Sequence, residues 1–202
     1  MTIPRAFVLM AALAGCAAPN AATPESAGAA SDARNAAVLR VARAMLATGG
    51  CREAKPAIAG APLLMNDPGF PGALRQPVPV EGCGARGLLN IMVLPLPQGG
   101  ARLSPLFPGT TRADATLQRD GLLYALAALK AVAPDCERVT VNDTRFRGAA
   151  GGGAAGDSTT PAWSEHWVLG ACDQAFVVPI RFIPNASGTA VAVSPGEIRR
   201  LS

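Results

Sequence analysis

Apolar side chains recur at helical spacing in two stretches of the chain. The first stretch, 32–48, ends at Gly49-Gly50. Its apolar face consists of Val38, Val41, Ala42 and Met45. The second stretch, 113–132, carries Leu122, Leu126, Leu129 and Val132 along one stripe. At its start, Thr111 and Asp114 have the spacing of a capping box. The pattern therefore predicts two helices, each with one apolar face.

After Cys136 the spacing of apolar residues changes from helical to alternating. A first strand is predicted at 136–147, where Val139 and Val141 alternate with polar neighbours. Further strands are predicted at 162–171, 175–183 and 189–193, with a hairpin turn over 184–188. We therefore expect an α+β fold, in which a small antiparallel sheet of about four strands packs against one or two helices and is disulfide-bonded.

Ten prolines interrupt the stretch from 52 to 108. Proline has no backbone N–H, so long regular elements are not expected there. The best strand candidate is 88–94, a short apolar run between Gly87 and Pro95. We expect one domain over 32–202, irregular from 52 to 108 and built of a helix and an antiparallel meander from 109 to 194.

Residues 1–15 have the layout of a secretory signal. Arg5 is the only charge before Cys16, and the apolar run 6–14 is too short to span a bilayer. The motif Leu13-Ala14-Gly15-Cys16 is similar to the lipobox of bacterial lipoproteins. The alternative is an ordinary secretory signal that is cut after Ala14.

The lipobox resemblance implies cleavage before Cys16, thioether lipidation of its thiol and acylation of the new amino terminus. Ala17 resembles the pattern of lipoproteins sent to the outer membrane. Residues 16–31 have no large apolar side chain and are expected to form a lipidated, flexible tether. The expected location is the outer membrane, facing the periplasm.

Cysteine arithmetic agrees with this location. The chain has five cysteines, and lipidation of Cys16 leaves four. An even number of cysteines can all form disulfides, as is typical in an oxidising compartment. The remaining four are Cys51, Cys83, Cys136 and Cys172. Four cysteines allow three pairings, and we favour Cys51–Cys83 and Cys136–Cys172 because each pair brackets neighbouring elements. A redox or zinc site is a weak alternative, since there is no Cys-x-x-Cys motif and one histidine.

A second motif lies in the predicted strand 162–171, where Trp163, Glu165 and Trp167 alternate before Cys172. Residues 105–194 resemble a group of small exported proteobacterial proteins of unknown function. Those proteins share a Trp-x-Glu-x-Trp segment, a cysteine, an alternating strand and a Gly-Thr hairpin. Asp173 stands where they usually have glycine. The resemblance implies no activity.

Trp163, Glu165 and Trp167 point to one face of a strand, which permits two interpretations. In the structural one, the tryptophans cover the core and Glu165 pairs with an arginine such as Arg181 or Arg145. In the functional one, two aromatic rings flank a carboxylate and bind a cationic or glycan ligand.

The chain offers little for catalysis. His166, the sole histidine, faces away from Glu165 on a strand, and Asp143 is the one acid on a plausible neighbouring strand. No metal, phosphate, dinucleotide or haem motif is present, so we expect no cofactor and no metal. The net charge of +4 comes from scattered arginines, which argues against nucleic acid as a partner.

We therefore expect a lipid-anchored envelope protein of non-enzymatic binding or assembly function. Its partners would be the membrane, through the anchor, and an envelope protein or glycan. The alternative is a lipid-anchored periplasmic hydrolase acting on cell-wall or glycan material, using Glu165 with Asp143 or His166.

Overall fold

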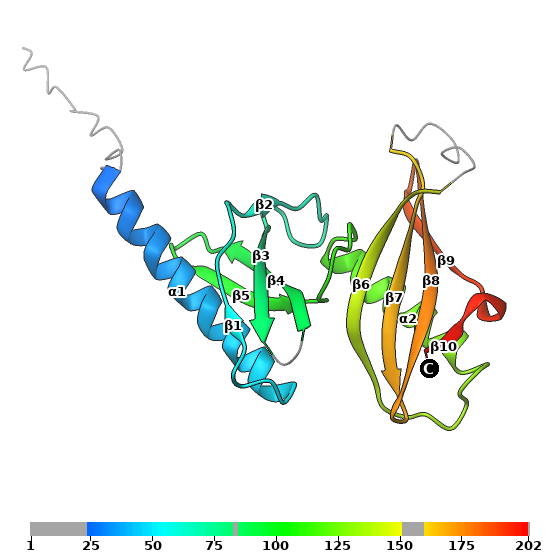
Figure 1. The fold of residues 1–202 in the computed structure, drawn as a ribbon. Coiled ribbons are helices and arrows are strands. Elements are labelled where there is room, and N and C mark those ends of the chain that lie inside the picture. Colours follow the sequence, from blue (N-terminus) through cyan, green and yellow to red (C-terminus); the bar gives the residue numbers. More distant parts are fainter. Residues whose placement is uncertain (1–23, 83–84, 151–159, 202) are drawn as a thin grey trace, which may run out of the picture.

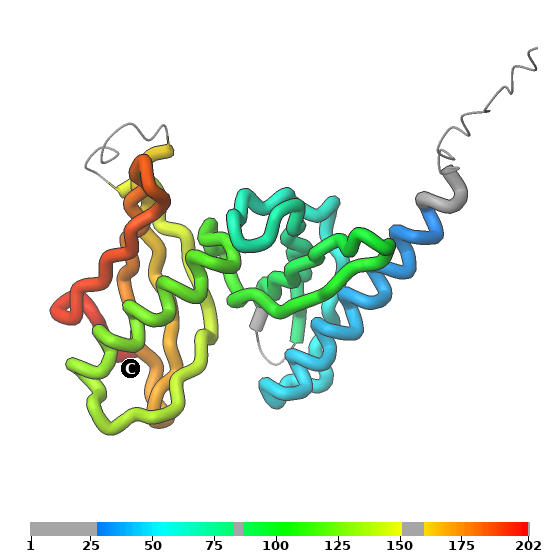
Figure 2. The backbone as a smooth tube through the Cα atoms, turned by 180° about the vertical axis from the view of Figure 1, so that it is seen from behind, coloured from blue at the N-terminus to red at the C-terminus, as the bar shows by residue number. Residues whose placement is uncertain are grey.

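A computed structural model describes residues 24–82, 85–150 and 160–201 (Figure 1). These residues form two antiparallel sheets of five strands, each with one helix across one face (Figures 1 and 2). The fold is mixed α+β, as predicted. The sequence predicted a single sheet of about four strands, whereas the structure has two sheets. The two sheets lie in two lobes joined by residues 107–114, which we call the connecting segment.

The first lobe has the strand order β1-β3-β4-β5, with β2 paired to β3. Its elements are α1 (Pro24–Thr48), β1 (Lys55–Pro56), β2 (Leu63–Leu64), β3 (Leu74–Gly82), β4 (Ala85–Pro95) and β5 (Ala101–Leu106). Val38 and Ala42 of α1 are fully buried against Val78, Ile91 and Val93 of the sheet. The predicted helix over 32–48 is confirmed, and it begins earlier, at Pro24.

The extra turns of α1 overlap the predicted tether. Residues 24–31 carry no large apolar side chain, so the hydrophobic pattern gave no signal for a helix there. The remainder of the tether, together with Cys16 and the predicted signal, lies outside the described residues.

The prolines between 52 and 108 predict short, irregular elements, whereas β3 and β4 run for 9 and 11 residues. Pro77 and Pro79 lie within β3, opposite Asn90 and Leu88. The carbonyl of Pro79 accepts a hydrogen bond from the Ala57 backbone, so the polar backbone groups of Pro79 point away from β4. A missing N–H on that side removes no β3–β4 bond, which is why the strand tolerates proline.

The second lobe has the strand order β10-β8-β7-β6, with β9 paired to β8. Its elements are α2 (Ala115–Leu129), β6 (Val139–Ala149), β7 (Trp163–Ala171), β8 (Gln174–Asn185), β9 (Gly188–Val193), a 3-10 turn (Pro195–Glu197) and β10 (Arg199–Leu201). The four predicted strands and the hairpin turn are confirmed. Strand β10, which pairs with β8, was not predicted.

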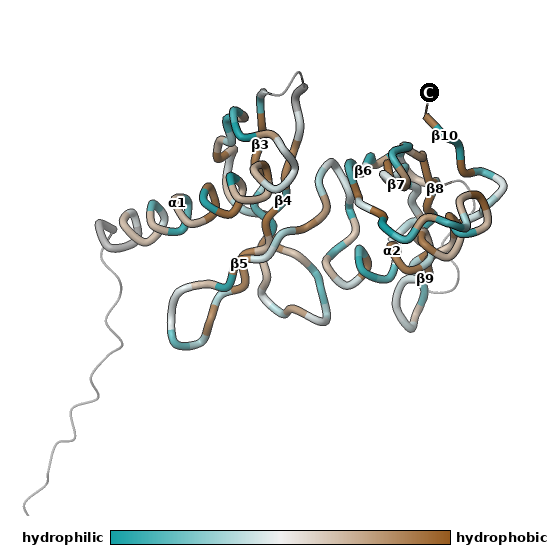
Figure 3. Tube along the Cα trace, turned by 90° about the horizontal axis from the view of Figure 1, so that it is seen from below, coloured by the Kyte–Doolittle hydropathy of each residue, from teal (hydrophilic) through white to brown (hydrophobic). Residues whose placement is uncertain are grey.

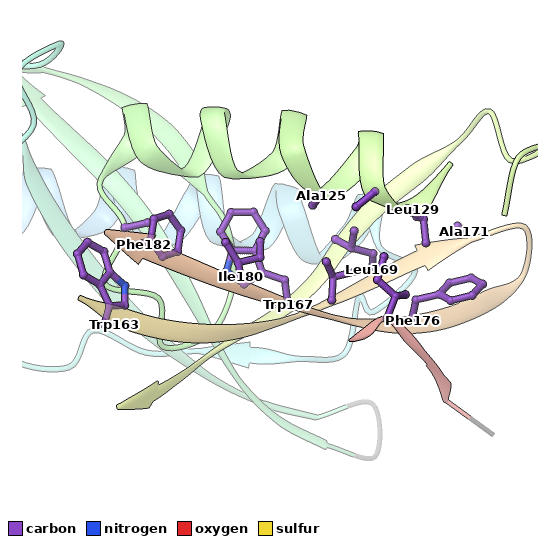
Figure 4. Close-up of a cluster of buried hydrophobic side chains, with 13 residues drawn as sticks. Ala125, Leu129, Trp163, Trp167, Leu169, Ala171, Phe176, Ile180 and Phe182 are labelled. Atoms are coloured by element: carbon purple, nitrogen blue, oxygen red, sulfur yellow. The ribbon is translucent and has the colours of Figure 1, made fainter. Parts of the chain in front are cut away.

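Helix α2 packs on the inner face of this sheet (Figure 4). Figure 3 shows hydrophobic residues on α2 and on the strands beside it. The helix comes so close that a Cβ at Gly121 would lie 2.8 Å from Cη2 of Trp167. Asp114 caps the helix and accepts a hydrogen bond from the Leu117 amide at 2.8 Å. Thr111 instead accepts from the Ala113 amide and lies outside the cap.

The disulfide Cys136–Cys172 is present as predicted, with the two Cα atoms 5.6 Å apart. It ties the approach to β6 to the turn between β7 and β8. Cys172 and Asp173 form this two-residue turn with φ of 48° and 57°, a conformation that favours glycine but that aspartate also tolerates. Cys51 is disulfide-bonded too. Its predicted partner, Cys83, lies outside the described residues, so this pairing stays a prediction.

Candidate functional site

The carboxylate of Glu165 is the centre of the candidate site, and it is fully buried. One oxygen accepts from the indole N–H of Trp163 at 3.0 Å and from the backbone N–H of Arg112 at 2.7 Å. The other oxygen accepts from the indole N–H of Trp167 at 2.8 Å. Three donors from two elements therefore converge on one side chain. Burial of a carboxylate is tolerated when it is hydrogen-bonded in this way.

The two tryptophans belong to an aromatic cluster around the carboxylate. Trp163 stacks on Phe182, with ring centroids 4.9 Å apart and an interplanar angle of 14°. Trp167 and Phe107 pack in a T-shaped arrangement, with ring centroids 5.3 Å apart. Trp163, Glu165 and Trp167 share one face of β7, as predicted, and that face is the core of the second lobe. Their packing is the arrangement expected from the structural interpretation.

The expected pairing of Glu165 with Arg181 or Arg145 is wrong. Arg145 lies opposite His166 on the outer face of the sheet and donates to Asp143 at 2.6 Å. Arg181 lies opposite Ser164, which is also on the outer face. The sheet separates both guanidinium groups from the carboxylate, because neighbouring residues of a strand face opposite sides.

Arg75, which comes from β3 in the other lobe, lies near enough for the charge of Glu165 to act on it. Burial lowers the pKa of Arg75, and the negative charges of Glu165 and Asp114 oppose that shift. Its guanidinium donates hydrogen bonds to the backbone carbonyls of Thr111 and Ala113. Arg75 therefore holds the connecting segment from one side while Glu165 holds it, through Arg112, from the other.

The connecting segment is fixed to both sheets at its other end too. The Asn90 side chain donates to the carbonyls of Phe107 and Gly109, at 2.9 Å each. The Thr144 hydroxyl donates to the Pro108 carbonyl at 2.6 Å. Gly109 has φ of 100°, and a Cβ there would collide with the backbone of Thr144. The close approach of the segment to β6 therefore requires glycine.

These partners were missed at the sequence level. Arg75 lies 36 and 38 residues from its acceptors, so no local spacing connects them. Asn90 carried a usable signal, because it is a polar residue inside the predicted apolar strand and is buried. A buried amide needs partners, and here it finds the connecting segment.

The groups proposed for hydrolysis are not brought together. His166 is half-buried on the outer face of β7, and Asp143 lies on the outer face of β6. Burial lowers the pKa of His166, and the charges of Arg147, Arg199 and Arg145 lower it further. Glu165 points the other way and is enclosed.

A hollow of about 540 Å³ opens beside Trp163, where β2 of the first lobe faces the start of α2. Its lining includes Leu63, Leu64, Arg75, Asp114 and Thr189. The two leucines are 58% and 68% exposed, so they form an apolar rim at its mouth. The volume lies in the range of small-ligand and side-chain pockets. Through this hollow an outside group can reach the surroundings of Trp163.

Within the described ranges, no group of three or more His, Cys, Asp or Glu side chains is placed to hold a metal ion. None of the described helices is both long and apolar enough to cross a membrane. Comparison with protein-family models, with curated proteins and with solved structures finds no match.

Proposed function

We propose that this protein is a lipid-anchored cell-envelope protein that acts as a non-enzymatic binding or assembly module. The lipobox carries the anchor. The observation that supports the binding role is the hollow beside Trp163, which is open and rimmed by the exposed Leu63 and Leu64. The Glu165 carboxylate, in contrast, accepts hydrogen bonds from three donors of the fold itself. A contiguous exposed apolar rim is typical of a protein-binding surface.

The same geometry weighs against the hydrolase alternative. A general acid must reach the scissile bond of its substrate. Glu165 is fully buried, and both of its oxygens accept hydrogen bonds from groups of the fold. Asp143 is on the opposite face of the sheet, where it is bonded to Arg145.

Site-specific photo-cross-linking tests the binding role. A photoreactive residue at Leu64 should give a discrete adduct in intact cells, because this side chain stands at the mouth of the hollow. The matched control is Leu123, which is 61% exposed on α2. Adducts at neither position, or equal adducts at both, would argue against the hollow as a binding surface.

The anchor has a separate test. Cells grown with labelled palmitate should incorporate label into the wild-type protein and into Cys51→Ala, which keeps the lipobox. Cys16→Ala should carry no label and should leave the outer-membrane fraction. Label that persists in Cys16→Ala would overturn the proposed anchor.

A further inference from the structure

The outer face of the second sheet carries a group of arginines. The inner side chains of β7 and β8 are buried under α2, so their neighbours along each strand point outward. Register places Arg145 beside His166, Arg181 beside Ser164 and Arg199 beside Val177. Figures 1 and 2 show α2 on one side of this sheet and no described helix on the other. Arg147 lies in a β-bulge of β6, and its charge acts on His166. We call Arg145, Arg147, Arg181 and Arg199, together with His166, the arginine face.

The charges of the arginine face lie close enough to act on one another. Arg145, Arg147 and Arg199, from two strands, all lower the pKa of His166, although burial is the larger cause. Asp143 lies on the same face and is bonded to Arg145. Glu197 lies at the edge, beside a hollow of about 540 Å³ that Arg181 also lines. Among the described residues around His166, Arg145, Arg147 and Arg199 outnumber Asp143, so this part of the face is positive.

The chemistry of these cations favours one class of partner. All four are arginines, whose planar guanidinium groups bind carboxylates through two parallel hydrogen bonds. They are spread over β6, β8 and β10, with strands about 4.8 Å apart. The side chains between them, such as Val168 and Pro179, are compact. A small anion would reach one or two guanidinium groups, whereas an extended chain with repeated carboxylates reaches all of them.

The position of the face argues against the anchoring membrane as the partner. The amino-terminal end of α1, nearest the predicted anchor, points away from the second lobe (Figure 1). We propose that the arginine face binds an acidic peptide segment of a protein partner. This inference rests on the proposed function as a binding module, but it uses a surface separate from the hollow beside Trp163.

A fluorescein-labelled twelve-residue glutamate-rich peptide is the probe, with its glutamine counterpart as the neutral control. Arg145→Gln, Arg147→Gln and Arg199→Gln combined should weaken binding about thirtyfold, since each exposed ion pair contributes roughly threefold. The matched variant removes three exposed arginines of the first lobe, Arg40, Arg43 and Arg102, by the same substitution. It should bind within about threefold of wild type. Equal loss in both variants would show attraction by net charge alone and would overturn the proposal.

His166 reports on the face directly, because it is the one histidine of the chain. In an NMR titration the peptide should raise the pKa of His166, since bound carboxylates offset the neighbouring arginine charges. An unchanged His166 resonance at saturating peptide would overturn the proposal. So would tighter binding of phosphatidylglycerol vesicles or of polygalacturonate than of the peptide. Cross-linking at Leu64 is independent of these outcomes, so failure here is distinguishable from failure of the proposed function.

Discussion

Replacing Glu165 by glutamine tests whether its carboxylate serves the fold. The glutamine carbonyl can still accept from Arg112 and Trp163, but both bonds lose their ionic part, about 1 kcal/mol each. The glutamine NH2 then faces the indole N–H of Trp167, which is left without an acceptor at a cost of about 2 kcal/mol. Removing the buried charge recovers about 1–2 kcal/mol after the lost attraction to Arg75 is subtracted. The free energy of unfolding should therefore fall by about 2.5 kcal/mol.

Urea denaturation followed by tryptophan fluorescence measures this change, because Trp163 and Trp167 are the two tryptophans of the chain. The matched control, Asp143→Asn, neutralises a carboxylate on the opposite face of the sheet. That carboxylate pairs with the exposed Arg145, so its loss should change stability by less than about 0.5 kcal/mol. If Glu165→Gln unfolds within 0.5 kcal/mol of wild type, the three hydrogen bonds do not stabilise the fold and the structural interpretation of the motif fails.

Three further substitutions follow from the packing. Gly121→Ala should lower stability by about 1–3 kcal/mol in calorimetry, because its methyl group would press on Trp167; a raised melting temperature would contradict this. Replacing Cys136 and Cys172 together by alanine should lower the free energy of unfolding by about 4 kcal/mol, because the unfolded chain is no longer restricted by a 36-residue loop. Urea denaturation measures this change, and a loss below about 1 kcal/mol would refute the prediction. Asp114→Asn keeps a capping side chain but removes a carboxyl whose pKa is raised, chiefly by burial. Below pH 3.8 the wild type and this variant should have the same free energy of unfolding. As the pH rises through the raised pKa of Asp114, the wild type should become the less stable of the two. Urea midpoints measured between pH 3 and 7 check this, and the reverse trend would contradict it.

Much of the second lobe was predictable from local patterns. Alternation over 162–171 predicted both strand β7 and the shared face of Trp163, Glu165 and Trp167. The Cys136–Cys172 disulfide followed from the closeness of the elements that it joins. Such features depend on neighbours in sequence, so their spacing reveals them.

The remainder depends on contacts between distant residues. The prolines of β3 are compatible with a strand only because their polar backbone groups face away from β4, and that depends on register. Glu165 was assigned an arginine from a neighbouring strand, whereas the electrostatic partner is Arg75 in the other lobe. The strand register keeps Arg145 away from Glu165, because Arg145 lies opposite His166 and shares the outer face of the sheet with it.

The connecting segment has a consequence for the order of folding. Strands β3 to β5, and β7 to β9, pair with their neighbours in sequence across connections of five residues or fewer, so most of each sheet can form from local hairpins. The bonds from Arg75 to Thr111 and from Arg112 to Glu165 close separations of 36 and 53 residues, and their loop-closure entropy is correspondingly larger. Because the indoles share the carboxylate with Arg112, tryptophan fluorescence should follow this late docking of the two lobes, while circular dichroism follows the hairpins.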